Sequence, residues 1–130
     1  TLGYEVCLSL TKAKIGQSSF VCLGRDPFVG TDPVAIFSLL AKDTATKIIL
    51  YLTETTFATD DRIINWIAAN PLQPVIVYVA DNPTKEYAEL NAAVLTAQEK
   101  KERFQQAGAY IVESPQYIAG FIKQKIGTNL

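Results

Sequence analysis

The residues of this sequence that could hold an anion gather between positions 24 and 31. Gly24 and Gly30 bound a loop that contains Arg25, whose guanidinium matches the geometry of a phosphate group. Asp26 lies in the same loop, and Thr31 follows it just before an expected helix. Two interpretations are open for Asp26 and Thr31: they contact a phosphate or a partner, or they form a turn and a helix cap whatever the function.

The most informative feature of the composition is what it lacks. The 130 residues contain no histidine, which excludes a Ser-His-Asp triad, an imidazole general base and histidine metal ligands from this chain. We therefore predict no metal site. The sequence also contains no methionine, even at position 1, so we expect a piece of a longer protein.

The charges indicate neither nucleic acid nor membrane as a partner. The net charge is −1 and the two signs are mixed, so no basic surface for nucleic acid is predicted. No apolar run approaches the roughly 18 residues that span a bilayer. The stretch 100–103 (KKER) follows Glu99 and is predicted to be a solvated helix face.

The two cysteines, Cys7 and Cys22, lie in apolar stretches and are predicted to be buried, reduced thiols. Reduced thiols fit the cytoplasm or, in a eukaryote, the mitochondrial matrix.

Strands and helices are expected to alternate along the chain. Helices are predicted over 2–14, 33–42, 60–69 and 97–107 and from Ser114 onward, and strands over 19–23, 47–52, 74–79 and 109–112. The segment 85–93 is left open as helix or ordered loop. This order predicts one α/β domain over 1–130, flavodoxin-like and doubly wound, with a mainly parallel sheet of about four strands. Its ligand site is expected beyond the carboxyl ends of the strands.

Several of these segments, in the same order and at similar spacing, resemble the succinyl-CoA synthetase α-subunit family. The family reads approximately TLTYE, then GQS, then GGDPxxGT, and the matching stretches here are 1–5 (TLGYE), 16–18 (GQS) and 24–31 (GRDPFVGT). Weaker matches at 48–50, 74–77 and 106–109 extend the resemblance over the whole chain. It implies the C-terminal CoA-ligase domain of that family, a fold shared with NDP-forming acyl-CoA synthetases.

The resemblance also implies a chemistry. In the family, an acyl-CoA and phosphate are exchanged for an acid, CoA and a nucleoside triphosphate, and a histidine carries the phosphoryl group. Phosphate is held at helix N-termini, which makes Thr1 a further candidate for anion binding. CoA and a nucleotide are expected only for a complete family enzyme, with no cofactor bound by this chain. The implied partners are a β-subunit-like chain, additional domains, or a second copy.

The departures from the family pattern fall on its catalytic loops. Asn91 stands at the phosphohistidine position, and an amide is not a nucleophile for phosphoryl transfer. Glu54 lies near the position of the glutamate that orients the histidine in the family, either as its relic or as an exposed loop residue. The two glycines that follow in the family are Thr56 and Phe57 here, and Arg25 replaces a third. We therefore predict no retained catalytic residue.

Three hypotheses follow. The first is a catalytically degenerate ligase domain with a structural or regulatory role in an acyl-CoA synthetase-like protein or complex, since the losses fall on the catalytic loops. The second is an active component of an acyl-CoA or acyl-phosphate enzyme whose catalytic groups come from other domains. The third is a small-anion or nucleotide-binding module.

Overall fold

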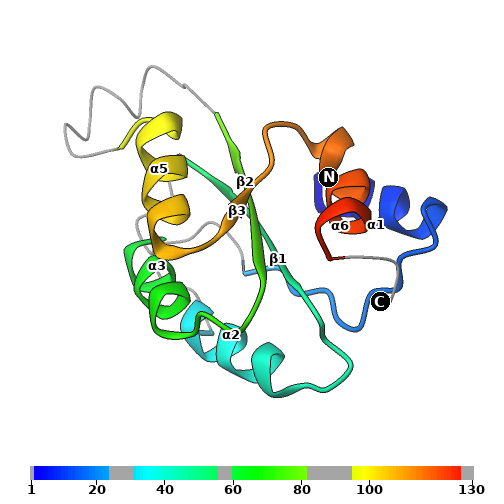
Figure 1. The fold of residues 1–130 in the computed structure, drawn as a ribbon, viewed down its shortest axis with the longest axis horizontal. Helices are drawn as coiled ribbons and strands as arrows, with labels where there is room; N and C mark the ends of the chain where they lie inside the picture. Colours follow the sequence, from blue (N-terminus) through cyan, green and yellow to red (C-terminus); the bar gives the residue numbers. More distant parts are fainter. Residues whose placement is uncertain (1, 24–30, 56–59, 82–94, 127–130) are drawn as a thin grey trace.

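The fold was obtained as a computed structural model, which describes residues 2–23, 31–55, 60–81 and 95–126. The described elements alternate between helix and strand for most of the chain (Figure 1). In chain order they are α1 (Leu2–Lys12), α2 (Pro33–Lys42), β1 (Ile49–Glu54), α3 (Asp60–Ala69), β2 (Val75–Ala80), α5 (Ala97–Ala107), β3 (Tyr110–Ile111), the 3-10 turn η1 (Pro115–Tyr117) and α6 (Ile118–Ile126).

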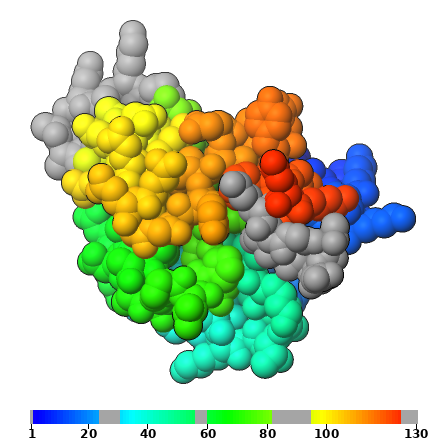
Figure 2. Space-filling model, viewed as in Figure 1, coloured from blue at the N-terminus to red at the C-terminus, as the bar shows by residue number. Residues whose placement is uncertain are grey.

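The described strands form one parallel sheet in the order β1-β2-β3. The helices α2, α3 and α5 cover one face of this sheet, while α1 and α6 lie on the other (Figure 1). The space-filling view shows α3 and α5 side by side on their flank of the molecule (Figure 2). This arrangement confirms the predicted α/β class and the mainly parallel sheet with helices on both faces.

Both faces of the strands are covered, which explains why their sequences are nearly continuous apolar runs. In β2, Val75, Val77 and Val79 pack in the core shared with α2, α3 and α5, whereas Ile76 packs in the core shared with α1 and α6. The two cores are therefore separated by the sheet itself. The first contains Phe37, Ile49, Ile63, Ile67, Val75, Val77, Val79, Phe104 and Ala109, and the second contains Val6, Leu10, Ile76, Val112, Ile118 and Ile122.

The predicted strand at 19–23 is wrong, and the described part of the sheet has three strands rather than four. A short apolar run forms a strand only where a neighbouring strand completes its hydrogen bonds, and this segment pairs with none of the described strands. Phe20 instead packs against Tyr4 of α1, with ring centroids 5.6 Å apart, and remains 48% exposed. The other three predicted strands are present, although β3 is shorter than predicted.

The cysteine prediction also needs correction. Cys22 is exposed and Cys7 is only half-buried, although both thiols are free as expected. A strand over 19–23 would bury Cys22 in the sheet. Because this strand does not form, the Cys22 thiol is exposed. Within the ranges that the structure describes, no helix is long and apolar enough to cross a membrane.

The start of α2 is set by Asp32, the residue that follows Thr31. Its carboxylate accepts a hydrogen bond from the backbone N–H of Val34 at 3.1 Å, and Pro33 occupies the first turn. The Arg62 guanidinium of α3 donates to both oxygens of the same carboxylate at 2.9 Å. Asp32 therefore joins two helices as well as capping one.

The bond from Arg62 makes the pKa of Asp32 testable. It is the main reason why the pKa of this carboxyl lies below its usual 3.8, so its contribution to stability is present above that value and is lost as the pH falls through the lowered pKa. Arg62→Gln is expected to raise the pKa of Asp32 toward its usual value, as measured by an NMR titration of the carboxyl carbon. Arg103→Gln, which removes another exposed arginine paired with Asp61, is the control and should leave Asp32 unchanged. An Asp32 pKa that does not respond to Arg62→Gln would contradict the assignment.

Candidate functional site at the carboxyl edge of the sheet

Buried polar side chains gather at the edge of the sheet where a ligand site was predicted. Thr53 and Thr55 lie at the end of β1, Asp60 opens α3, and Lys100 lies in the first turns of α5. These four are all the buried polar or charged residues in the part of the chain that the structure describes. Since burying polar groups is unfavourable unless they are paired, their concentration at one edge indicates a built interaction.

The centre of this interaction is an ion pair between Asp60 and Lys100. The Lys100 Nζ atom lies 2.7 Å from Asp60 Oδ2, and the two side chains are 4% and 3% exposed. The Tyr51 hydroxyl donates to Asp60 Oδ1 at 2.8 Å, and the Thr53 hydroxyl lies 3.0 Å from Oδ2. Lys100 Nζ also donates to the backbone oxygen of Glu54 at 2.9 Å. We refer to Tyr51, Thr53, Asp60 and Lys100 as the Asp60–Lys100 cluster.

The geometry of the Asp60–Lys100 cluster suits positioning better than covalent chemistry. Burial, together with the negative charge of Asp60, raises the pKa of the Tyr51 phenol, so this group stays protonated and serves as a donor. The Lys100 ammonium is enclosed by oxygen acceptors from two other elements. Charges that are paired and enclosed in this way hold elements together and are not presented to a substrate.

The prediction that residues 100–103 form a solvated face is wrong for Lys100, which is 3% exposed. A charge run along the sequence does not show which members face the core. The burial of Lys100 follows instead from its position along the helix. Thr96 and Glu99 form a capping box that fixes the start of α5. From that start, Lys100 lies on the same face as Ala97 and Phe104, three residues after one and four before the other.

Among the candidate site residues that the structure describes, Glu54 lies at this edge. It is the last residue of β1 and is half-buried, and its backbone oxygen accepts the bond from Lys100. Thr31 is exposed before α2, where the neighbouring Asp32 provides the cap. The other predicted site residues lie outside the described residues: Thr1, Gly24, Arg25, Asp26, Gly30 and Asn91.

The helix starts described on the α2, α3 and α5 side of the sheet carry carboxylates of the chain itself. Asp32 caps α2, Asp60 and Asp61 lie in the first turn of α3, and Glu99 accepts the backbone N–H of Thr96 at the start of α5. A carboxylate at a helix N-terminus binds the N–H groups and the positive dipole end that would otherwise attract a phosphate. A phosphate bound at the start of α2 would therefore compete with Asp32.

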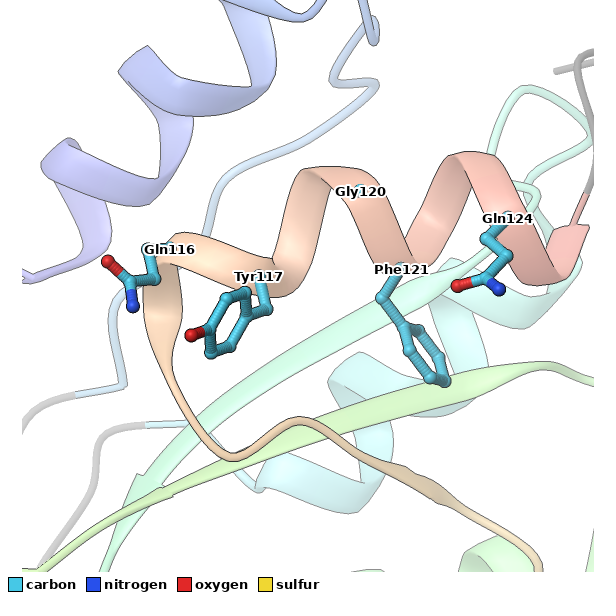
Figure 3. A pocket seen from close by; sticks show the side chains of 5 residues that line it. All are labelled: Gln116, Tyr117, Gly120, Phe121 and Gln124. Carbon is cyan, nitrogen blue, oxygen red and sulfur yellow. The ribbon is translucent and has the colours of Figure 1, made fainter.

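A shallow depression lies elsewhere, on α6 and the turn before it (Figure 3). Tyr117 and Phe121 project from the same side of the helical segment, and the Phe121 ring packs against Tyr110 of β3 with centroids 5.8 Å apart. Gln116 and Gln124 supply its polar groups. The depression holds no carboxylate or ammonium group, so it offers nothing for phosphoryl transfer. No group of three or more metal-ligating side chains occurs in the ranges that the structure describes.

Comparison with known proteins places these observations in a family context. No family model matches the chain. It is 32% identical over 122 residues to the α-subunit of ADP-forming succinate–CoA ligase from Aquifex aeolicus. The matched region covers 88% of this chain and 40% of that protein. The chain is 30% identical over 131 residues to the α-subunit 2 from Archaeoglobus fulgidus (95% and 45%) and 28% identical over 125 residues to the α-subunit from Staphylococcus aureus (91% and 41%). The chain thus spans about two fifths of the length of the curated relatives it matches.

Proposed function

This chain is a relative of the α-subunits of ADP-forming succinate–CoA ligase, as its motifs predicted, and from that kinship we propose an α-subunit-like ligase domain that does not carry a phosphoryl group itself. Its role is structural or regulatory within an acyl-CoA synthetase-like protein or complex. The proposal separates two properties of the family: the scaffold, which the chain keeps, and the phosphoryl carrier, which it lacks.

The observation that carries the proposal is the absence of histidine from a chain whose described residues at the carboxyl edge are buried and hydrogen-bonded. The sequence contains no imidazole to form a phosphohistidine, and the amide of Asn91 cannot replace one. The Asp60–Lys100 cluster, by contrast, is fully paired, and every buried side-chain nitrogen or oxygen in the described residues has a hydrogen-bond partner. Function is lost more easily than fold, because a site occupies a few residues of a scaffold.

The proposed partner is a β-subunit-like chain or a further domain of the same protein, since the relatives are named as α-subunits. CoA and a nucleotide would be bound by the complete protein and its partner, and not by these 130 residues alone. The half-buried Glu54 at the end of β1 favours one alternative, in which another chain supplies the histidine and this carboxylate orients it.

A phosphorylation assay tests the proposal. The protein that contains this chain, in its full natural length, is incubated with radiolabelled ATP, Mg²⁺ and the β-subunit from Aquifex aeolicus. We expect no acid-labile phosphoryl group on this chain, because no histidine is available to carry it. The Aquifex aeolicus α-subunit, treated in the same way, is the positive control. Acid-labile label on this chain would overturn the proposal.

Complex formation is measured on the same samples by analytical ultracentrifugation. Binding of the β-subunit without labelling of this chain is expected for a domain that docks but does not react. Labelling of a histidine on a second chain, when this chain is present, would favour the alternative in which Glu54 orients an imported imidazole.

A further inference from the structure

We infer that Lys100 is a positioning residue that fixes the backbone at the carboxyl end of β1. It thereby fixes the backbone position from which the Glu54 side chain extends. The inference rests on the proposed function only through its alternative, in which the Glu54 carboxylate orients an imidazole from another chain. Lys100 reaches the end of β1 through the contacts of the Asp60–Lys100 cluster.

The backbone groups of β1 alternate in direction along the strand. The N–H of Ile49 bonds to the oxygen of Pro74 at 3.0 Å, and the N–H of Thr55 bonds to the oxygen of Ala80 at 3.3 Å. In a parallel pair, backbone groups of alternate residues point to opposite sides of the strand, so the odd-numbered residues of β1 face β2. The Glu54 oxygen therefore points away from β2, and it accepts a hydrogen bond from Lys100 Nζ.

The bond from Lys100 is coupled to the bond between Thr55 and Ala80. The Glu54 oxygen and the Thr55 N–H belong to the same peptide unit, which is planar and moves as one body. Lys100 holds one side of this unit and Ala80 holds the other. Loss of the Lys100 bond is therefore expected to loosen the hydrogen bond from Thr55 to Ala80, the last one described between these two chain segments.

Lys100 is itself held in place by its helix and by Asp60. The capping box of Thr96 and Glu99 sets the start of α5, and Phe104 anchors the same face of the helix in the core. Asp60, 40 residues earlier in the sequence, holds the ammonium from α3. Three elements thus meet at one nitrogen atom, which gives the end of β1 a rigid support.

A purely structural role for the ion pair makes a different prediction from a positioning role. If Lys100 serves only to neutralise Asp60, removing both charges together should restore the molecule, because no unpaired charge remains buried. If Lys100 positions Glu54, the double variant should regain stability relative to the single one and still have a loose end of β1. The pair of variants Lys100→Met and Asp60→Asn with Lys100→Met separates the two roles.

The readout is amide hydrogen exchange, measured by NMR on the full-length protein. In the double variant we expect the Thr55 amide to exchange about ten to a hundred times faster than in the wild type, the range for the loss of one charge-assisted hydrogen bond. The Val112 amide, which bonds to the Val77 oxygen at 3.1 Å between β2 and β3, is the internal reference and should change little. Lys101→Met is the matched control, because Lys101 is adjacent to Lys100 in the chain but pairs with the exposed carboxylate of Glu113.

A Thr55 exchange rate that returns to the wild-type value in the double variant would overturn the inference, since the ion pair would then act only through its charges. The double variant leaves no uncompensated charge, so it decides the question even where Lys100→Met alone does not fold. The assay involves no phosphoryl transfer, and its outcome is independent of the phosphorylation assay that tests the proposed function.

Discussion

Replacing Asp60 with alanine is expected to lower the free energy of unfolding by about 3–5 kcal/mol, the range for breaking one side of a buried ion pair. The Lys100 ammonium would stay in a site where its side chain is 4% exposed, without the carboxylate that lies 2.7 Å away. The hydroxyls of Tyr51 and Thr53 would lose their shared acceptor as well. The measurement is equilibrium unfolding in urea, where the midpoint should fall while the slope stays constant.

The adjacent residue provides the control for this prediction. Asp61 lies in the same first turn of α3 and pairs with Arg103 at 3.2 Å, but the two side chains are 70% and 50% exposed. Exposed ion pairs contribute roughly 0–1 kcal/mol, so Asp61→Ala should shift the urea midpoint only slightly. Equal shifts for the two alanine variants would mean that the Asp60–Lys100 cluster does not stabilise the fold.

The second large effect is expected for Phe104→Ala, which should cost about 3–5 kcal/mol of stability. The Phe104 side chain is completely buried, lies between α5 and the sheet, and has its ring centroid 6.2 Å from that of Tyr51. Its removal leaves a cavity next to the Asp60–Lys100 cluster, and a packed interior closes such cavities only in part. Thermal unfolding followed by circular dichroism measures the loss as a lower Tm.

Phe20→Ala is the matched control for Phe104→Ala, since it deletes the same atoms from a ring that is 48% exposed. Phe20→Ala should lower the free energy of unfolding by about 1 kcal/mol or less, because only part of the Phe20 ring is removed from water on folding. A loss as large as that of Phe104→Ala would show that the contact between Phe20 and Tyr4 contributes far more than its exposure indicates.

Most of the elements could be predicted from the sequence because their signals are local. The helices over Pro33–Lys42, Asp60–Ala69 and Ala97–Ala107 are found with the predicted bounds, each set by a capping residue, a proline or a glycine within a few positions. Gly108, with a φ of 109°, ends the last of them in the left-handed conformation that glycine adopts without strain. The two long strands were predicted because an apolar run of that length fits a sheet covered on both faces.

The errors arose where tertiary contacts decide the outcome. The apolar segment 19–23 has strand composition but no strand partner among the described residues, and this also left Cys22 exposed. Lys100 lies in a charged run, yet it is buried because an acidic partner 40 residues away meets it. The sequence predicted a ligand site at the carboxyl edge of the sheet, where the Asp60–Lys100 cluster lies, but it did not predict the pairing of Asp60 with Lys100 across two helices.

The arrangement of the two cores has a consequence for synthesis on the ribosome. Strands β1, β2 and β3 are neighbours in space in the same order as in the chain, so each can pair with its predecessor as it emerges. The core around Ile76 and Val112, however, closes only when Ile118 and Ile122 of α6 pack beside α1, which was made first. A nascent chain that stops short of α6 would expose one apolar face of a finished sheet, the kind of surface that holdase chaperones bind.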